Sequence, residues 1–370
     1  MKKTKILFHK IELLIVIALC FIMTSCNGQE HNRDKQNKIK ETKIAALDSN
    51  LKESQSNNQS VAASFQFPNF DNQISDVVRT VFQDSKGNIW FGTQNGAFRY
   101  NGKSLTRIDS IKSESGRTVT IKDIAESKDG RIWFGHTDGI SVIEGESVSN
   151  YYESDGLLSN DVWCITTDQN NQVWIGTIEG VCKFDGKHFT PFEIPEGKLD
   201  TSVGVSSTKM IHSIMEDSQG RMWFSTNGGI YIQDQNLLSH ISEEDGLSTS
   251  LINEVIEDQS GNFWISTPQG LFQLSGASLI NRTEKLFEES KGTGSIIADA
   301  KGNIWFNCAR SIYRLNGEEL TEYRIAEGNY GPLTFQIYED RQERLWFVGY
   351  GGAFRYENDQ FINITKDGPF

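Results

Sequence analysis

The stretch Asp84-Ser85-Lys86-Gly87-Asn88-Ile89-Trp90-Phe91-Gly92-Thr93-Gln94-Asn95-Gly96 is the unit that the rest of the chain repeats. The same frame recurs around six further tryptophans, at Trp133, Trp174, Trp223, Trp264, Trp305 and Trp346. The successive intervals are 43, 41, 49, 41, 41 and 41 residues. A period near 40 residues with one tryptophan per unit is typical of a repeat architecture.

Each unit predicts four short strands. An apolar run such as Val77–Phe82 predicts the first strand. The triplet Ile89-Trp90-Phe91 places large apolar side chains on both faces of the second strand, so both faces should be buried. Ala97–Tyr100 predicts a third strand, and Asn101-Gly102 marks a tight hairpin into a fourth.

The turn before each tryptophan strand ends at a position that favours positive φ. Six units place there the residue types that adopt this conformation most easily: Gly87, Gly130, Asn171, Gly220, Gly261 and Gly302. The last unit has Glu343 instead. The sequence therefore predicts that this one turn is strained or differently shaped.

Seven such units predict an all-β fold, a seven-bladed β-propeller with four antiparallel strands per blade, over residues 65–370. A closed ring needs no capping unit, and no unit here resembles one. Phe65–Phe67 and Phe361–Ile364 could each supply an outer strand where the ring closes. The sequence leaves this choice open, and we favour the C-terminal segment as the fourth strand of the seventh blade, flanked by the N-terminal one.

The N-terminal residues predict export and a lipid anchor. Residues 1–25 combine four lysines with an apolar run, Leu13–Met23, which is too short to span a bilayer. Thr24-Ser25-Cys26 resembles the end of a bacterial lipoprotein signal peptide, which implies lipidation of Cys26; the alternative is an ordinary signal with a stray cysteine. Residues 26–64 are polar and predict a disordered tether. We therefore expect a membrane-anchored lipoprotein of the cell envelope, in the outer rather than the inner membrane, facing the periplasm or the cell surface.

Charge and cysteine content exclude several classes of partner. The formal net charge is −13, and removal of residues 1–25 changes it to −16, because four lysines and one glutamate are lost. Such a chain is a poor candidate for binding nucleic acid, which relies on basic patches. Cys164, Cys182 and Cys308 are odd in number and lack metal-ligand spacing, so buried free thiols are expected.

The sequence shows no catalytic motif. It lacks a glycine-rich phosphate loop, a His-Glu-x-x-His pair and a nucleophile elbow. We therefore predict no enzyme activity, no cofactor and no metal, and we look for function in the positions where the repeats differ.

Two aligned columns vary where the inter-blade connections should emerge. The first occupies the start of the innermost strands: Arg79, Lys122, Trp163, His212, Asn253, Gly294 and Phe335. The second ends the tryptophan strands: Thr93, His136, Thr177, Thr226, Thr267, Cys308 and Gly349. The chemical variety of the first column suggests ligand contact, although an edge position that tolerates any residue would look similar.

Trp163 is the one tryptophan of the mature chain outside the repeat column. Near a channel mouth it would offer a stacking platform for a sugar ring or an apolar ligand. The alternative is that it packs beneath the Gly156-Leu157-Leu158 connection. The predicted ligand site comprises Trp163, Arg79, Lys122, His136, His212, Asn253, Tyr330 and Tyr350. For His136, a structural role is the competing hypothesis.

One insertion, about residues 193–208, lengthens the interval between the third and fourth units. Its glycines and serines predict a mobile loop on the face that carries the two columns. Loops longer than their neighbours often carry function on a rigid scaffold.

The repeated pattern Asp-x-x-Gly-x-Φ-Trp-Φ-Gly-Thr-x-x-Gly-Φ, where Φ is apolar, is clearest at 83–97 and 257–271. It resembles the two-component-regulator propeller repeat. Asp155-Gly156-Leu157, echoed by Asp245-Gly246-Leu247, resembles the inter-blade motif of the same family. The resemblance covers residues 65–370. It implies a periplasmic sensor of the kind found in hybrid histidine kinases that respond to oligosaccharides, although the sequence contains no kinase segment.

Three functions are compatible with these observations. We favour a lipid-anchored module that binds or senses a glycan or peptide ligand and could feed a two-component signalling or uptake system. The first alternative is a protein-interaction scaffold in the envelope. The second is an enzyme resembling streptogramin lyases, whose propellers repeat a similar tryptophan pattern; a lyase would need a clustered acid–base pair.

Overall fold

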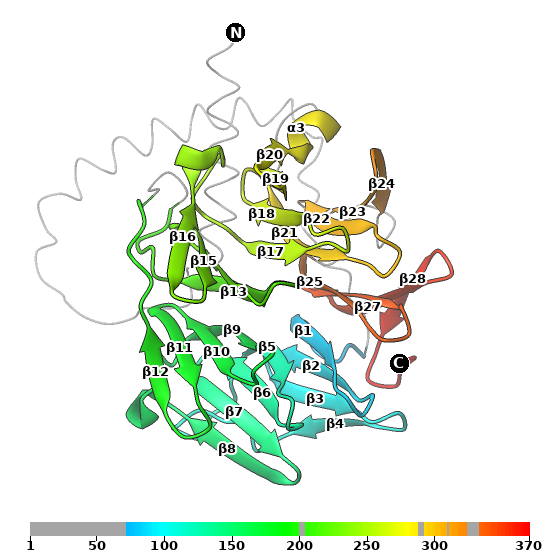
Figure 1. The fold of residues 1–370 in the computed structure, drawn as a ribbon. Coiled ribbons are helices and arrows are strands. Elements are labelled where there is room, and N and C mark those ends of the chain that lie inside the picture. The colour runs from blue at the N-terminus through cyan, green and yellow to red at the C-terminus, as the bar shows by residue number, and fades with distance from the viewer. Residues whose placement is uncertain (1–71, 200–203, 288–291, 309–310, 324–332) are drawn as a thin grey trace, which may run out of the picture. The chain divides into compact units, whose positions relative to one another are not determined.

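The computed structural model describes residues 72–199, 204–287, 292–308, 311–323 and 333–370. These residues form seven four-stranded sheets, and in each sheet all neighbouring strands are antiparallel and consecutive in the chain. The sheets surround a central channel as the blades of a propeller (Figure 1). The predicted seven-bladed β-propeller is therefore confirmed. Cys26, Tyr330 and Phe65–Phe67 lie outside the described residues.

The blades follow the chain in order. Blade 1 holds β1 (Val78–Gln83), β2 (Ile89–Thr93), β3 (Gly96–Tyr100) and β4 (Leu105–Ile108); blade 2 holds β5 (Ile121–Glu126), β6 (Ile132–His136), β7 (Gly139–Glu144) and β8 (Ser147–Tyr151); blade 3 holds β9 (Val162–Thr167), β10 (Val173–Thr177), β11 (Gly180–Phe184) and β12 (Phe189–Phe192). Blade 4 holds β13 (Ile211–Glu216), β14 (Met222–Thr226), β15 (Gly229–Asp234) and β16 (Leu237–Ile241).

The remaining blades complete the ring. Blade 5 holds β17 (Glu254–Glu257), β18 (Phe263–Thr267), β19 (Gly270–Ser275) and β20 (Ser278–Asn281); blade 6 holds β21 (Thr293–Ala298), β22 (Ile304–Cys308), β23 (Ser311–Asn316) and β24 (Glu319–Tyr323); blade 7 holds β25 (Thr334–Glu339), β26 (Leu345–Gly349), β27 (Gly352–Glu357) and β28 (Gln360–Ile364). Among the described residues, three short helical segments lie in connections between blades: η1 (Glu153–Asp155), η3 (Glu243–Asp245) and α3 (Arg282–Leu286).

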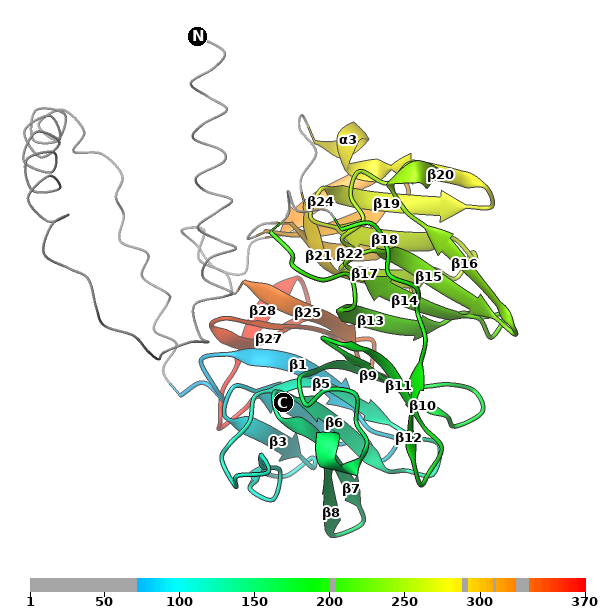
Figure 2. The same ribbon diagram turned by 90° about the vertical axis from the view of Figure 1, so that its left-hand side faces the viewer.

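The C-terminal segment β28 is the fourth strand of blade 7, as favoured from the sequence. The first and last blades meet in Figure 2, where β1 lies beside β25. At this seam Gln73 Nε2 donates a hydrogen bond to Asn363 Oδ1 at 2.6 Å. The C-terminal Phe370 crosses to blade 1 and stacks on Tyr100, with ring centroids 4.1 Å apart. The ring is therefore closed by side chains and by isolated backbone bridges such as Gln73 with Thr365, and no described strand is exchanged between the two blades.

The hydrophobic core is divided among the blade boundaries. Seven apolar clusters fill the space between neighbouring blades, one at each boundary. Six of the seven repeat tryptophans pack against an aromatic side chain of the following blade, as Trp90 does on Phe134 at 5.4 Å between centroids. Trp346 makes the same contact with Phe91 across the seam, at 5.8 Å. The alternating large residues of the tryptophan strand are thus buried on both faces, because each blade is covered by two neighbours.

The acidic residue that begins each turn has a direct structural role. Its carboxylate accepts a hydrogen bond from the indole nitrogen of the tryptophan six residues later, at 2.8–3.0 Å, in Asp84, Asp168, Asp217, Asp258, Asp299 and Asp340. Blade 2 uses the Ser127 hydroxyl instead. A cation also lies over every repeat tryptophan, at Arg99, Arg131, Lys183, Arg221, Arg282, Arg314, Arg344 and Arg355. The motif therefore buries each indole while satisfying its one polar atom.

The turn at Glu343 has the same shape as its counterparts. Glu343 has a φ of 57°, and its N–H donates to the Asp340 carbonyl at 2.9 Å. Gly87 makes the equivalent 2.9 Å bond to Asp84 with a φ of 85°. Of the two outcomes predicted from the sequence, the structure shows the strained one, because a glutamate is held in the left-handed region.

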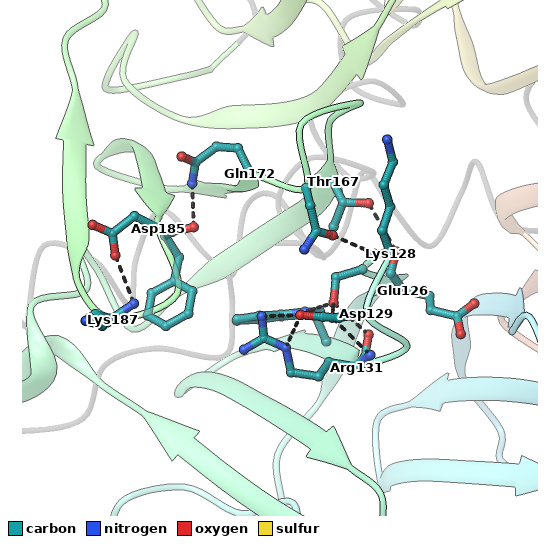
Figure 3. A network of polar contacts seen from close by, with 12 residues as sticks. Glu126, Lys128, Asp129, Arg131, Thr167, Gln172, Asp185 and Lys187 are labelled. Carbon is teal, nitrogen blue, oxygen red and sulfur yellow. Dashed lines mark hydrogen bonds and ion pairs between the residues drawn. The ribbon is translucent and has the colours of Figure 1, made fainter.

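Polar contacts link neighbouring blades on the face that carries these turns. Figure 3 shows the boundary of blades 2 and 3, where Thr167 Oγ1 donates to the Glu126 carbonyl at 3.1 Å. Across the same boundary, the Lys128 N–H of blade 2 donates to Asn171 Oδ1 of blade 3 at 2.6 Å. The Glu126 carboxylate in turn accepts a 2.6 Å bond from the Ser85 N–H of blade 1. This face of the ring is fixed by blade-to-blade bonds, which leaves the opposite face for a site.

Cys164, Cys182 and Cys308 are buried and form no disulfide, as expected. The inter-blade Asp-Gly-Leu motif also has a clear role. Gly156 and Gly246 take φ values of 97° and 107° after η1 and η3, and the leucines that follow, Leu157 and Leu247, are buried. The motif therefore ends a short helical turn and inserts one apolar side chain between blades.

Candidate functional site

The first variable column lines a cavity of about 430 Å³ in the central channel. All seven of its members contribute: Arg79, Lys122, Trp163, His212, Asn253, Gly294 and Phe335. They come from seven different blades. We call this cavity the channel site.

Backbone irregularities explain why this column faces the channel. In β1, Val78 pairs with Thr93 and Thr80 with Gly92, so Arg79 is an extra residue opposite the partner strand. The same irregularity occurs at Lys122, Trp163, His212 and Phe335. Such β-bulges turn a side chain out of the regular alternation. The sequence analysis located the column but did not predict the bulges.

Trp163 is the centre of an aromatic and cationic cluster. Lys122 Nζ lies 3.7 Å from its ring centroid, and Arg79 Cζ lies 5.9 Å away. Arg79 also lies 4.8 Å from the Phe335 centroid, which brings blades 7, 1, 2 and 3 together. His212 meets the Trp163 ring at 6.4 Å in an edge-on arrangement. Trp163 therefore faces the channel, and the alternative of packing beneath the 156–158 connection is not seen; Leu157 fills that place.

Asp161 is a site residue that the sequence analysis missed. Its carboxylate pairs with Lys122 and also lies 3.4 Å from Trp163 Nε1, which donates to it. Burial lowers the pKa of Lys122 to about 8, although the attraction of Asp161 opposes this shift. The sequence could have indicated Asp161, because this residue lies two positions before Trp163, the one non-repeat tryptophan.

A second ring of side chains lies next to the first in the channel. Asp123 Oδ2 accepts the Ile165 N–H of the following blade at 2.8 Å, and Glu254 Oε2 accepts the Ile296 N–H at 3.0 Å. Burial raises the pKa of each carboxyl group to about 7. The sequence analysis also missed these two acids, because it considered only the first position of each inner strand.

The other polar members of the column are held in place by their neighbours. His212 Nε2 donates to Asn227 Oδ1 at 2.6 Å, and burial lowers the pKa of this histidine. Asn253 Nδ2 donates to the Thr293 carbonyl of blade 6 at 2.7 Å. These bonds fix the side chains before any ligand arrives, which reduces the entropy lost on binding.

Two predicted site residues, His136 and Tyr350, do not line the channel site. His136 is fully buried, contacts Ser141 Oγ at 3.1 Å and accepts the Asp138 N–H at 3.2 Å through Nδ1. Burial lowers its pKa to about 3. Tyr350 is 41% exposed and lies beside Phe335, with centroids 5.2 Å apart, at the rim. Tyr330 lies outside the described residues.

The second variable column closes turns and does not line the channel site. Thr93 Oγ1 donates to the Gly96 carbonyl at 2.8 Å and accepts the Asn95 N–H at 3.0 Å. Thr177, Thr226 and Thr267 make the equivalent bonds to the glycine carbonyl. His136 occupies the same position, which explains why it is buried.

Comparison with known families identifies the repeat. The model of the two component regulator propeller matches residues 72–95, 156–179 and 204–228. Each matched segment spans an inner strand, the following turn and a tryptophan strand. Among curated proteins, no sequence matches the chain significantly. Within the described part of the chain, no helix is long and apolar enough to cross a membrane.

Solved structures share the fold at low identity. Virginiamycin B lyase from Staphylococcus aureus is 17% identical, with a TM-score of 0.59 over 76% of this chain and 95% of that chain. YCF48 bound to D1 peptide is 11% identical, with a TM-score of 0.57 over 78% and 96%. The extracellular domain of the hybrid two component system BT3049 from B. thetaiotaomicron is 18% identical over 76% and 56%, and its TM-score of 0.41 supports no inference. Identities this low show the propeller fold alone.

Proposed function

Because this chain carries two-component regulator propeller repeats, we propose that it is a binding or sensing module whose ligand occupies the channel site. One observation carries the proposal. Seven blades that are otherwise alike present seven different residues to one cavity, and these include a part-exposed tryptophan flanked by two cations. A few oriented polar groups around an aromatic surface are the usual composition of a ligand pocket.

The chemistry of the cavity favours a glycan or peptide ligand. Trp163 offers a flat face for a sugar ring or an apolar side chain. Arg79 and Lys122 can donate hydrogen bonds to ligand oxygens, and the Lys122 ammonium is held over the ring by Asp161. The ligand would therefore present one apolar face and several oxygen atoms.

We propose binding without catalysis. The carboxylates that line the channel site already accept backbone hydrogen bonds from the next blade, and His212 is bonded to Asn227. An acid–base pair for a lyase reaction would need groups that are free to exchange protons with a substrate. The polar groups of this cavity instead hold the ring together and orient the tryptophan.

Replacement of Trp163 by alanine should weaken ligand binding by about tenfold or more. An aromatic stacking contact contributes roughly 0.5–1.5 kcal/mol beyond its buried area, and about 1.4 kcal/mol corresponds to one decade of affinity. A thermal-shift screen of glycans and peptides on residues 65–370 would identify the ligand, and calorimetric titration would compare the variant with the wild type.

The Trp163→Ala protein should remain folded, because its apolar clusters are unchanged and the seven repeat tryptophans are intact. A Trp163→Phe variant, which keeps a stacking surface, should bind with intermediate affinity. Unaltered binding by the alanine variant would place the ligand elsewhere, and unfolding would show that Trp163 belongs to the core.

We also propose that the propeller is held at the cell envelope through lipidated Cys26, with residues 26–64 as a tether. The N-terminal sequence supports this assignment. A single acyl chain binds membranes only marginally, whereas several chains on one residue anchor stably. A sensor on such a tether could contact a two-component or uptake partner in the envelope, and this contact would depend on whether the ligand is bound.

Cys26→Ser should release the protein from the membrane fraction, because lipidation requires the thiol. Fractionation of cells that express the full chain, followed by immunoblotting, measures this directly. Cys20→Ser, within the expected signal peptide, is the matched control and should leave fractionation unchanged. An unchanged distribution of the Cys26 variant would contradict the lipid anchor without touching the assignment of the channel site.

A further inference from the structure

A second cavity, of about 470 Å³, lies beside blade 4 and away from the channel site. Its walls come from the insertion that follows β12, from strands β15 and β16, and from η3. We call it the blade-4 groove. It shares no lining residue with the channel site, so it has to be explained separately.

The groove is built by close packing of two glycines. Gly197 of the insertion lies against Gly228 of the β14–β15 turn, and a Cβ on Gly228 would come within 3.1 Å of the Gly197 Cα. A side chain on Gly197 would collide with the Gly228 carbonyl. Further along the insertion, the Ser207 carbonyl accepts a 2.9 Å bond from Asn227 Nδ2. The described parts of the insertion are therefore seated on one turn of blade 4 and form a defined wall.

One buried polar group in the groove lacks a protein partner. Tyr231 is 4% exposed, and its ring stacks on His240 with centroids 4.4 Å apart. Its hydroxyl makes no hydrogen bond to any described residue, yet it is not among the atoms sealed from solvent. Tyr231 lines the groove, and its hydroxyl can be reached from solvent. A solvent-accessible hydroxyl without a protein partner can bond to a ligand atom without giving up a hydrogen bond within the protein.

The charges around this hydroxyl favour a cation. Glu196, Glu243 and Glu244 line the groove, against the single ammonium of Lys198. Lys209 lies 3.6 Å from Glu196, and Glu243 accepts the Ser250 N–H at 3.1 Å. The Glu244 carboxylate makes no hydrogen bond or ion pair within the described residues. An acidic protein with a free carboxylate at a pocket rim attracts positively charged groups.

We propose that the blade-4 groove binds a primary ammonium group, carried either by a free amine or by a lysine side chain of a polypeptide. The ammonium would donate hydrogen bonds to the Glu244 carboxylate and to the Tyr231 hydroxyl oxygen. His240 Nε2 lies 2.8 Å from the Gly228 carbonyl, which can only accept, so Nε2 carries the hydrogen and Nδ1 remains as an acceptor. The site is independent of the channel site.

The test titrates the propeller, residues 65–370, with cadaverine and with the peptide Gly-Lys-Gly, using 1,5-pentanediol and Gly-Gln-Gly as uncharged controls. We expect both amines to bind, the uncharged controls not to bind, and affinity to fall as salt is raised. Tighter binding of the peptide would identify a polypeptide as the source of the ammonium, and tighter binding of cadaverine would identify a small amine.

Two variants locate the interaction. Tyr231→Phe keeps the ring in its cluster and removes only the hydroxyl, and Glu244→Gln removes one exposed charge. Each should weaken cadaverine binding about tenfold or more, as expected for the loss of one hydrogen bond to a charged group. Asp234→Asn, at the far end of β15, and Trp163→Ala should leave it unchanged.

Equal binding of pentanediol and cadaverine would overturn the proposal. So would the absence of amine binding by the wild type, or titrations that neither Tyr231→Phe nor Glu244→Gln affects. Because Trp163→Ala is tested in parallel, failure of the channel site and failure of the groove give different results.

Discussion

Replacement of Trp223 by alanine is expected to remove about 3–5 kcal/mol from the free energy of unfolding, as large truncations in protein cores do. Trp223 is 2% exposed and stacks on Phe263 of blade 5, with ring centroids 4.1 Å apart. Its indole nitrogen donates to Asp217 Oδ2 at 2.8 Å. The substitution would open a cavity between blades 4 and 5 and would leave a buried carboxylate without one of its donors.

Denaturant unfolding of residues 65–370, followed by far-ultraviolet circular dichroism, measures this effect. Trp223→Phe is the matched control. It keeps an aromatic ring in the cluster but loses the bond to Asp217, so it should cost less than the alanine variant. Trp163→Ala removes the same side chain from the channel site and should change stability far less. A loss below about 1 kcal/mol in Trp223→Ala would contradict the role given to the repeat tryptophans, since burial of a large side chain is worth more.

The fold could be predicted because its determinants are local and repeated. The tryptophan strand, the glycine turns and the hairpin signals recur in each unit, so errors in one unit are corrected by the others. The same redundancy located the first variable column, whose seven members line one cavity. A ring brings equivalent positions together, which is why alignment of the units could stand in for three-dimensional information.

The details that the sequence did not predict are local side-chain bonds, strand pairing and contacts between units. The bond from Asp217 to Trp223 joins residues of one unit and has a fixed spacing, so it could have been found from the motif. The bulge at Trp163 could not, because it depends on how β9 pairs with β10. The bonds made by Asp123 and Glu254 reach the next blade and appear only after assembly.

His136 and the insertion show that alignment of the repeats does not separate structural positions from ligand-binding ones. His136 stands in a column of threonines that close turns, and its difference from them reflects packing. The described parts of the insertion pack on the Asn227-Gly228 turn, and the mobility expected of this loop stays a prediction. Chemical variety in a column indicates function only where the column also faces a cavity.

The acids of the channel site should make the stability of the propeller depend on pH. Burial raises the pKa of Asp123 and of Glu254 to about 7 in the folded protein, well above the ordinary values of about 4 for unfolded chains. The folded state therefore binds these protons more tightly than the unfolded state. The stability that the two protonated carboxyl groups contribute is fully present below pH 4 and is lost as the pH rises through 7. Between pH 5 and pH 8 these two groups should lower the free energy of unfolding.

A comparison of variants isolates this effect from the histidines. Burial lowers the pKa of His136 and His212, which adds stability as the pH rises through 6.5 and so opposes the two acids in the wild type. The histidine contributions are the same in both proteins, so they cancel when the double variant Asp123→Asn/Glu254→Gln is compared with the wild type at each pH. The amide oxygens can still accept the backbone N–H groups of the next blade.

Relative to the wild type, the double variant should gain about 1–4 kcal/mol of unfolding free energy between pH 5 and pH 8. One pKa unit corresponds to about 1.4 kcal/mol. Water in the channel screens the charges, so the change in unfolding free energy should be smaller than the two pKa shifts alone would give. Lys122 affects only the upper end of this range, since its pKa is lowered to about 8. Gln336→Ala is the control: its side-chain oxygen accepts the Val81 N–H of the next blade at 2.7 Å but carries no charge, so its cost should not change with pH. A constant difference between the double variant and the wild type would show that the two carboxyl groups titrate as they do in water, and that the channel site is wetter than the packing of its inner strands implies.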